Sequence, residues 1–182
     1  GLDIGFSQPS DLPTGQSALV GARVITMADG SEDGGVIEDA TILVDGNRIM
    51  QVGRSRDVPI PTGTLIVELD GKTIMPGIVD VHAHVGGESN GIVAEQSWGL
   101  AANVAFGVTT SHDPSNNTET VFTNSEMTKA GFKLGPRLFS TGMILYGAEG
   151  NSKAIVDSYD DALKHLSRMK AVGAFSVKSY NQ

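Results

Sequence analysis

The chain has 182 residues, 40% of them hydrophobic, a formal net charge of −8 and a pI of about 4.8. This length fits one domain or one domain with a small second one, and the acidic balance argues against a nucleic-acid partner, whose binding surface is normally basic. Because cysteine is absent, disulfides and thiolate metal sites are excluded, while cytoplasm and periplasm both remain open as the location.

The N-terminal part is predicted to be an arm followed by a small sheet. Residues 1–16 are rich in Pro, Gly and Ser, which is typical of a linker. Within 17–76, strands are predicted at 18–27, 41–44, 48–52, 64–69 and 73–75. Asp45-Gly46-Asn47 and Asp70-Gly71 each predict a hairpin turn. We therefore expect an antiparallel sheet over 17–76 that forms part of a β-sandwich.

From residue 77 onward, strands and helices alternate. Strands are predicted at 77–84, 108–112, 137–143 and 174–178, and helices at 91–106, 119–130 and from a cap at Asp157 or Ser158 to Gly173. Asn90 is the candidate cap of the first helix. This alternation predicts a parallel α/β unit. A TIM barrel needs roughly 250 residues, whereas residues 77–182 number 182 − 76 = 106, near half a barrel. No apolar run reaches the roughly 18 residues of a membrane span, so no membrane partner is expected.

His82 and His84 stand two residues apart at the end of the predicted strand 77–84. Side chains at i and i+2 of a strand point to the same face, and two imidazoles on one face can hold a metal ion. A core histidine without a ligand is the plainer interpretation. However, active sites of barrels gather at the C-terminal ends of their strands. Imidazole suits zinc, manganese, iron, nickel or cobalt, so the sequence predicts a metal site of open identity.

The segment KTIMPGIVDVHAH, which runs from Lys72 to His84 after the predicted sheet, resembles the amidohydrolase superfamily of metal-dependent hydrolases. The resemblance covers about residues 17–182. It implies a (β/α)8 barrel flanked by a β-sandwich that both chain ends build. It also implies that His82 and His84 hold the more buried metal. Asp80 would then either support a metal-binding histidine or pack within the strand.

Lys178 ends the predicted strand 174–178, where it shares one face with Ala174 and Ser176, while Phe175 and Val177 are expected to face helices. In the binuclear members of the superfamily, a carboxylated lysine on the fourth strand bridges two metals, and the resemblance assigns that place to Lys178. A solvated lysine is the alternative, and a mononuclear deaminase of the same superfamily would not need it. The expected cofactor is therefore a divalent metal, with zinc favoured, as one or two ions.

Two other histidines lie in the predicted α/β unit. His112 shares a face of its predicted strand with Val108 and Thr110. It is expected either to contact a small-molecule substrate or to cap a loop. His165 lies beside Lys164 on the last predicted helix, where a solvated face is expected.

The resemblance implies hydrolysis of a C–N bond in a cyclic amide, an amidine or a dipeptide-like substrate, by water that a metal activates. Two further histidines and a general-base aspartate of the family come from later strands, so no catalytic residue is assigned here. Three hypotheses remain. The chain is a truncated hydrolase that is inactive alone, a half-barrel that a second copy or a complementing chain completes, or a non-catalytic binding or structural remnant.

Overall fold

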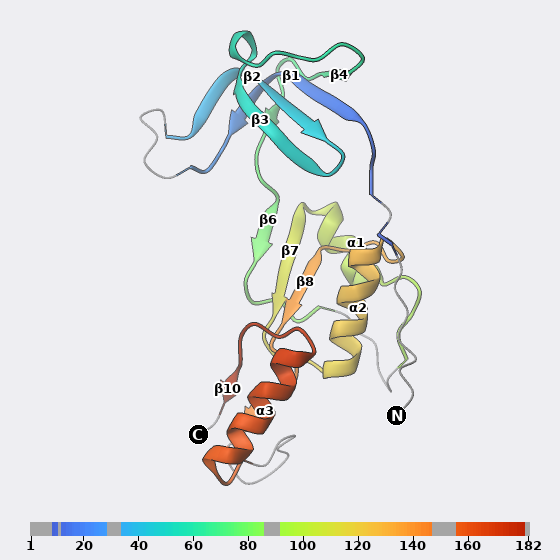
Figure 1. Cartoon of the computed structure of the whole chain (residues 1–182), viewed down its shortest axis with the longest axis vertical. Coiled ribbons are helices and arrows are strands. Elements are labelled where there is room, and N and C mark those ends of the chain that lie inside the picture. Colours follow the sequence, from blue (N-terminus) through green and yellow to red (C-terminus); the bar gives the residue numbers. More distant parts are fainter. Residues whose placement is uncertain (1–8, 11, 29–33, 86–91, 147–155, 181–182) are drawn as a thin grey trace. The chain divides into compact units, whose positions relative to one another are not determined.

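The structure is a computed structural model, and it describes residues 9–10, 12–28, 34–85, 92–146 and 156–180 (Figure 1). The chain divides into two compact units, one spanning Asp11–Pro76 and the other containing Gly77–Gln182. Each unit is described by itself.

The first unit is a five-stranded sheet. Its strands are β1 (Gln16–Ile25), β2 (Val36–Asp45), β3 (Arg48–Arg54), β4 (Leu65–Glu68) and β5 (Thr73–Ile74), with a short 3-10 helix, η1, at Ser55–Asp57. The order is β3-β2-β1-β4, and β5 also pairs with β1. The hairpin predicted around Gly46 is confirmed, because Asp45 of β2 pairs with Arg48 of β3. Gly46 has a φ of 55°, in the left-handed region that glycine favours in such a loop.

The second predicted hairpin is wrong, and the sheet is mixed. β4 and β5 do not pair with each other; both run parallel to β1, with Ser17 opposite Leu65 and Arg23 opposite Thr73. The register offset grows from 65 − 17 = 48 to 73 − 23 = 50, so two extra residues bulge out around Asp70-Gly71. Backbone bonds continue on either side of this bulge, at 2.8 Å from Leu69 N to Val20 O and 2.9 Å from Arg23 N to Lys72 O. The Asp-Gly pair therefore kinks one strand along the free edge of β1 instead of reversing the chain.

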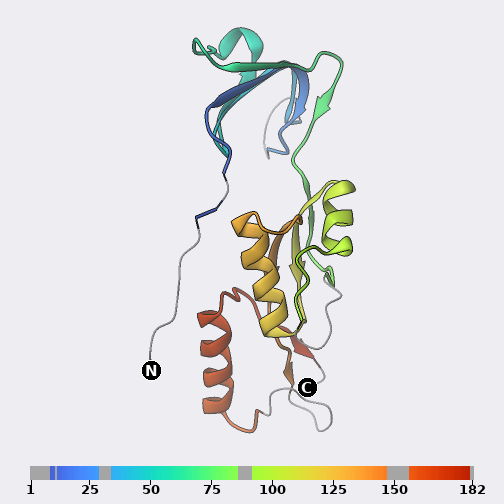
Figure 2. The same ribbon diagram turned by 90° about the vertical axis from the view of Figure 1, so that its right-hand side faces the viewer.

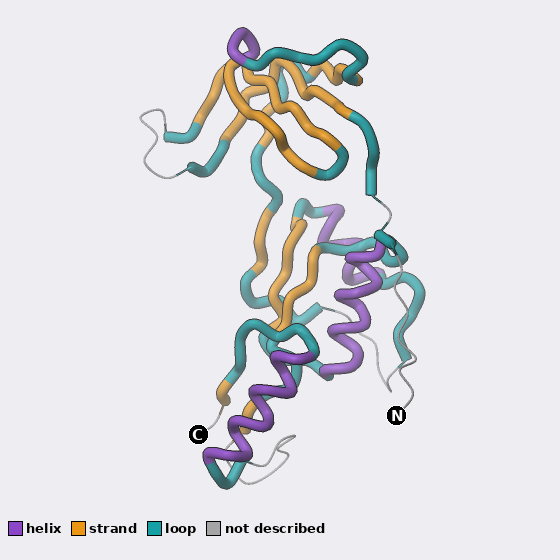
Figure 3. The backbone as a smooth tube through the Cα atoms, viewed as in Figure 1, coloured by secondary structure: helices purple, strands orange, loops and turns teal. Residues whose placement is uncertain are grey.

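The second unit alternates strands and helices, as Figure 3 shows. Its elements are β6 (Ile78–Asp80), α1 (Trp98–Ala105), β7 (Val108–Asp113), α2 (Thr118–Ala130), β8 (Arg137–Ser140), β9 (Leu145–Tyr146), α3 (Tyr159–Ala171) and β10 (Ser179–Tyr180). β6, β7 and β8 form a parallel sheet in that order, and β9 and β10 form a separate parallel pair. The predicted parallel α/β alternation is therefore confirmed in these elements.

The ends of α2 and α3 follow from side-chain caps. The side chain of Asn117 accepts a hydrogen bond from Thr120 N at the start of α2, and Gly131 ends that helix in the left-handed region. Ser158 caps α3 by accepting from Asp161 N at 3.1 Å. Each cap satisfies a backbone group that the helix leaves open. The predicted helix over 119–130 and the cap at Ser158 are confirmed.

Several elements are shorter than predicted, and two of them have a clear local cause. The helix expected at 91–106 begins only at Trp98, and its candidate cap Asn90 lies outside the described residues. The Gln96 side chain explains the late start, because it bonds Phe132 O and Leu134 N, both at 3.0 Å, and so ties the preceding residues to a distant loop. The strand expected at 137–143 ends at Ser140, two residues before Gly142, whose φ of 64° leaves the extended region.

The core of the second unit lies between the sheet and its helices. Leu100 of α1 packs with Val85 and Leu138, and Ala83 lies against this cluster. α1 contacts β7 and α2 contacts β8 (Figure 2). This packing buries the side of the sheet that faces these helices and positions the chain just beyond β6. Within the described residues, no helix is both long and apolar enough to cross a membrane.

Candidate metal centre

His82 and His84 lie beyond β6, which ends at Asp80, so their predicted place within a strand is wrong. The Asp80 carboxylate accepts a hydrogen bond from His82 N at 3.0 Å and turns the chain there. Ala83 N then donates to His112 O at 3.0 Å, which keeps this segment beside β7. The two imidazole rings nevertheless meet edge to face, with centroids 5.5 Å apart. The turn at Asp80 and the hydrogen bond to β7 thus bring the two imidazoles together. Strand alternation, the predicted cause, is not the reason.

Asp113, at the end of β7, contacts the imidazole of His84 with its carboxylate. Its side chain is fully buried, and its Oδ1 lies 3.0 Å from His84 Nδ1. Ser115 N donates to the same oxygen at 3.2 Å. The other oxygen, Oδ2, accepts from Val85 N at 3.3 Å and from Asn116 Nδ2 at 2.7 Å. Because a carboxylate only accepts hydrogen bonds, these partners act as donors.

Asp113 is a site residue that the sequence alone indicates only weakly. Asp113 ends a strand in which Ser111 and His112 precede it, and alternation places it on the Ser111 face, opposite to His112. Ser111 and Asp113 are both buried. A charged residue on a buried strand face needs polar partners. That need indicates polar partners, but it does not by itself identify His84.

The histidine pair offers two metal ligands. The side chain of His84 remains 55% exposed although its Nδ1 contacts Asp113, and His82 is also exposed. A carboxylate on one imidazole nitrogen is the usual arrangement that orients the other nitrogen toward a metal. The donor set therefore fits a divalent cation in part. No group of three or more His, Cys, Asp or Glu side chains in the described segments is placed to complete such a site.

The strand predicted at 174–178 is absent, which changes the setting of Lys178. Residues 174–178 are irregular, and β10 begins at Ser179. Leu145 N donates to Lys178 O at 2.9 Å, so the backbone of Lys178 is fixed beside β9. The side chain is half-buried. β9 and β10 are each only two residues long, so the pairing of this segment with β9 begins at Lys178. The metal-ligand role of Lys178 stays a prediction.

His112 joins β7 to two neighbouring segments. Its Nε2 lies 2.9 Å from Ser176 Oγ and its Nδ1 lies 3.3 Å from Val81 O. The Phe175 ring, expected to face helices, instead contacts His112 and Phe139, with centroids at 5.4 and 5.6 Å. The irregular backbone at 174–178 breaks the strand alternation on which that expectation depended. An aromatic group therefore forms directly beside the segment that carries the histidine pair.

His165 is buried, which corrects the predicted solvated position. It is only 3% exposed, and its Nδ1 lies 3.1 Å from an Arg168 guanidinium nitrogen. Its Nε2 is buried without a hydrogen bond, although the Met143 backbone lies close enough to act on its charge. Burial and then the Arg168 charge lower the pKa of His165 below its ordinary value. The buried face of α3 therefore includes His165 and Met169, whereas Leu163 is half exposed.

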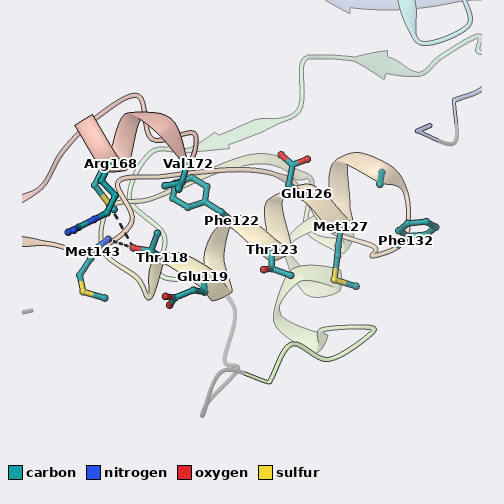
Figure 4. Close-up of a pocket in the computed structure, with 12 residues that line it drawn as sticks. Thr118, Glu119, Phe122, Thr123, Glu126, Met127, Phe132, Met143, Arg168 and Val172 are labelled. Carbon is teal, nitrogen blue, oxygen red and sulfur yellow. Dashed lines mark hydrogen bonds between the residues drawn. The ribbon is translucent and has the colours of Figure 1, made fainter. Parts of the chain in front are cut away.

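A groove lies between α2 and α3 (Figure 4). It has a volume of about 860 Å³, and its lining includes Phe122, Met127, Phe132, Met143, Met169 and Val172. Thr118, which also lines the groove, accepts a hydrogen bond through its Oγ1 from Met143 N at 3.2 Å. None of His82, His84 and Lys178 lines this groove. The apolar groove is therefore separate from the candidate metal centre.

No family model matches the chain. It is 34% identical to imidazolonepropionase of Anaeromyxobacter sp. (strain K) over 76 residues, 40% of this chain and 18% of that protein. Its structure is similar to that of a putative prolidase from Bifidobacterium longum, with a TM-score of 0.62 and 25% identity over 90% of this chain and 40% of the other. A solved amidohydrolase has a TM-score of 0.63 at 16% identity over 91% of this chain and 46% of its own, which concerns the fold alone. The chain thus spans less than half the length of these solved structures.

Proposed function

We propose that the chain is part of a metal-dependent hydrolase of the amidohydrolase superfamily that cleaves C–N bonds, because it is similar to an imidazolonepropionase over 76 residues and to a solved putative prolidase. The observation that carries this proposal is the pair of adjacent imidazoles beyond β6, one of them held by a buried carboxylate. Members of this superfamily generally use divalent metals. Such an ion would lower the pKa of a bound water to about 7 and polarise the bond to be cleaved.

In this proposal, His82 and His84 hold the metal. His84 would bind through Nε2, because its Nδ1 already contacts Asp113. Zinc is the proposed ion, since imidazole nitrogen suits it and the chain has no thiolate that would favour a softer site. Lys178 is the proposed third ligand. If it is carboxylated, two ions are expected, and if not, a mononuclear deaminase-like site is.

The aromatic group beside the histidines supports a substrate with an apolar or ring-shaped part. Phe175 is 70% exposed and lies against His112, whose Nδ1 contacts the backbone of Val81. A ring stacked on Phe175 would lie beside the segment that leads to the histidine pair. We therefore propose a dipeptide-like or cyclic amide substrate, with His112 positioned to contact it. The likeness to a prolidase at 25% identity favours the dipeptide-like class.

We further propose that the complete site requires strands beyond those described, in a (β/α)8 barrel with a flanking β-sandwich. β6 forms one edge of its sheet, and Ile78 and Val79 on this strand are 50% and 57% exposed. An apolar edge strand favours pairing with another strand. The remainder of a longer protein, a second copy or a complementing chain would supply it. A non-catalytic remnant would keep the edge but have no need of the histidine pair.

Metal binding tests the proposal. The chain is dialysed to equilibrium against Zn²⁺, and bound zinc is measured by mass spectrometry of the element. We expect zinc binding that His82→Ala weakens by at least about tenfold. His112→Asn is the matched control, because it removes a neighbouring histidine that is not a proposed ligand. Failure of the unaltered protein to bind any divalent metal would contradict the proposal and favour the non-catalytic remnant.

Activity is measured next, on the metal-loaded protein in its full length. The substrates are an Xaa-Pro dipeptide, a cyclic amide and an amidine, and release of the amine or opening of the ring is followed. A chelator should abolish turnover, and added zinc should restore it. Intact mass under native conditions then distinguishes the two site types, since carboxylation of Lys178 adds the mass of carbon dioxide.

A further inference from the structure

We propose that Asp113 is a positioning residue that fixes the tautomer of His84. It would keep the proton on Nδ1 and leave Nε2 as the nitrogen that faces the metal. This inference rests on the proposed metal-dependent function. Asp113 touches neither substrate nor metal, and its whole effect passes through the His84 ring.

The Asp113 carboxylate is held in place independently of His84. Three other groups donate to it: Ser115 N, Val85 N and Asn116 Nδ2. Its backbone is fixed as well, since Ser140 Oγ donates to Asp113 O at 2.7 Å. A fully buried carboxylate with this many partners cannot turn away to follow a moving ring. Asp113 therefore sets the position of His84, rather than the reverse.

The tautomer follows from what each atom can donate. A carboxylate has acceptors only, and a neutral imidazole has one donor nitrogen and one acceptor nitrogen. At 3.0 Å from Asp113 Oδ1, His84 Nδ1 must be the donor. The lone pair then resides on Nε2, which is the state that a metal requires.

Asp113→Asn preserves the shape of the side chain but replaces one acceptor with a donor. If the new NH2 group faced Val85 N, that buried donor would lose its acceptor. Asn116 would also have to turn its side-chain amide over, although this amide already bonds Val85 O and Asn117 N. If the NH2 group faced His84, only Ser115 N would lose its partner, because the imidazole can move its proton to Nε2 and accept on Nδ1. Ser115 is only partly buried, so water can replace that bond. The second orientation costs less, and the variant should switch the tautomer of His84.

The experiment measures the tautomer directly. Long-range proton–nitrogen spectra of the ¹⁵N-histidine-labelled, metal-free protein are recorded well above the pH range in which imidazole titrates. We expect His84 to carry its proton on Nδ1 in the unaltered protein and on Nε2 in Asp113→Asn. Zinc affinity should fall by about 10- to 100-fold in the variant. Asn116→Ser is the matched control, since it disturbs the same loop but leaves the carboxylate and should leave the tautomer unchanged.

Each outcome separates the two proposals. An Nε2–H tautomer in the unaltered protein would overturn the positioning role, and this measurement does not depend on any variant folding. An unchanged tautomer and zinc affinity in Asp113→Asn would overturn it too, while leaving the proposed function intact. If the unaltered protein binds no metal, the proposed function fails, and the spectra alone still decide whether Asp113 positions His84.

Discussion

Gly77 lies one residue before β6 and directly against Thr109 of β7. A Cβ atom added at Gly77 would overlap Oγ1 and Cγ2 of Thr109 and would lie 2.7 Å from its Cβ. Rotation about χ1 of Thr109 can move the first two atoms away, but it cannot move the Cβ. Because carbon atoms in contact lie about 3.5–4.0 Å apart, Gly77→Ala must push the two strands apart by roughly 1 Å.

The expected cost follows from what this separation disturbs. Overpacking of a well-fitted contact costs about 1–3 kcal/mol. The backbone bond from Ile78 N to Gly107 O, at 2.9 Å, adjoins the contact, and its weakening adds up to about 1 kcal/mol. We expect Gly77→Ala to lower the free energy of unfolding by about 2–4 kcal/mol, a large share of the roughly 5–15 kcal/mol of an ordinary domain.

Urea denaturation followed by circular dichroism measures this change. Gly99 is the matched control, since its added Cβ would meet nothing closer than Ser97 Oγ at 4.0 Å. It lies in α1, so Gly99→Ala should stabilise the protein by up to about 1 kcal/mol. In a Thr109→Gly background, which lacks the clashing Cβ, the further change Gly77→Ala should cost little. Equal midpoints for Gly77→Ala and the unaltered protein would refute the reasoning.

Two further predictions concern α3. Because the pKa of His165 is lowered in the folded state, the neutral ring is favoured there. The free energy of unfolding that the neutral ring contributes is fully present above the pKa of His165 in the unfolded chain, about 6.5. It is lost as the pH falls below that value, by at most about 1.4 kcal/mol per pH unit. His165→Leu should flatten this part of the stability–pH curve, and an unchanged slope would count against the burial of a neutral ring. Ser158→Ala should cost about 1 kcal/mol through loss of the cap on Asp161 N, whereas Ser158→Thr should retain most of it in thermal melts.

The fold was predictable where a local pattern decided the structure. The α3 range followed from helical spacing, and the cap of α3 followed from the hydroxyl of Ser158. Prediction failed where a distant partner decided. The Asp70-Gly71 pair makes a bulge because β1 offers a free edge, and α1 starts late because Gln96 bonds the loop at 132–134. Neither partner can be identified from a short window of sequence.

The site shows the same division. Spacing alone put His82 and His84 together, but the reason is a turn at Asp80 and a bond to β7, not strand alternation. Asp113 was overlooked because its contact with His84 spans 29 residues. The neighbouring Lys164 alone predicts a solvated position for His165. Its burial depends on packing with elements elsewhere in the chain.

The contacts that orient His84 are confined to a short part of the fold. Asp113 is anchored by the segment after β6, by the loop that follows β7 and by residues at the end of β8, and these hydrogen-bond partners lie between residues 84 and 141. This orientation therefore does not require later strands, whereas a complete ligand set would. Closure of a barrel would therefore supply further ligands to the metal, beside an imidazole whose Nε2 is already free to bind it. Completion should raise metal affinity without changing the His84 tautomer, since the carboxylate that fixes it is already buried and fully bonded.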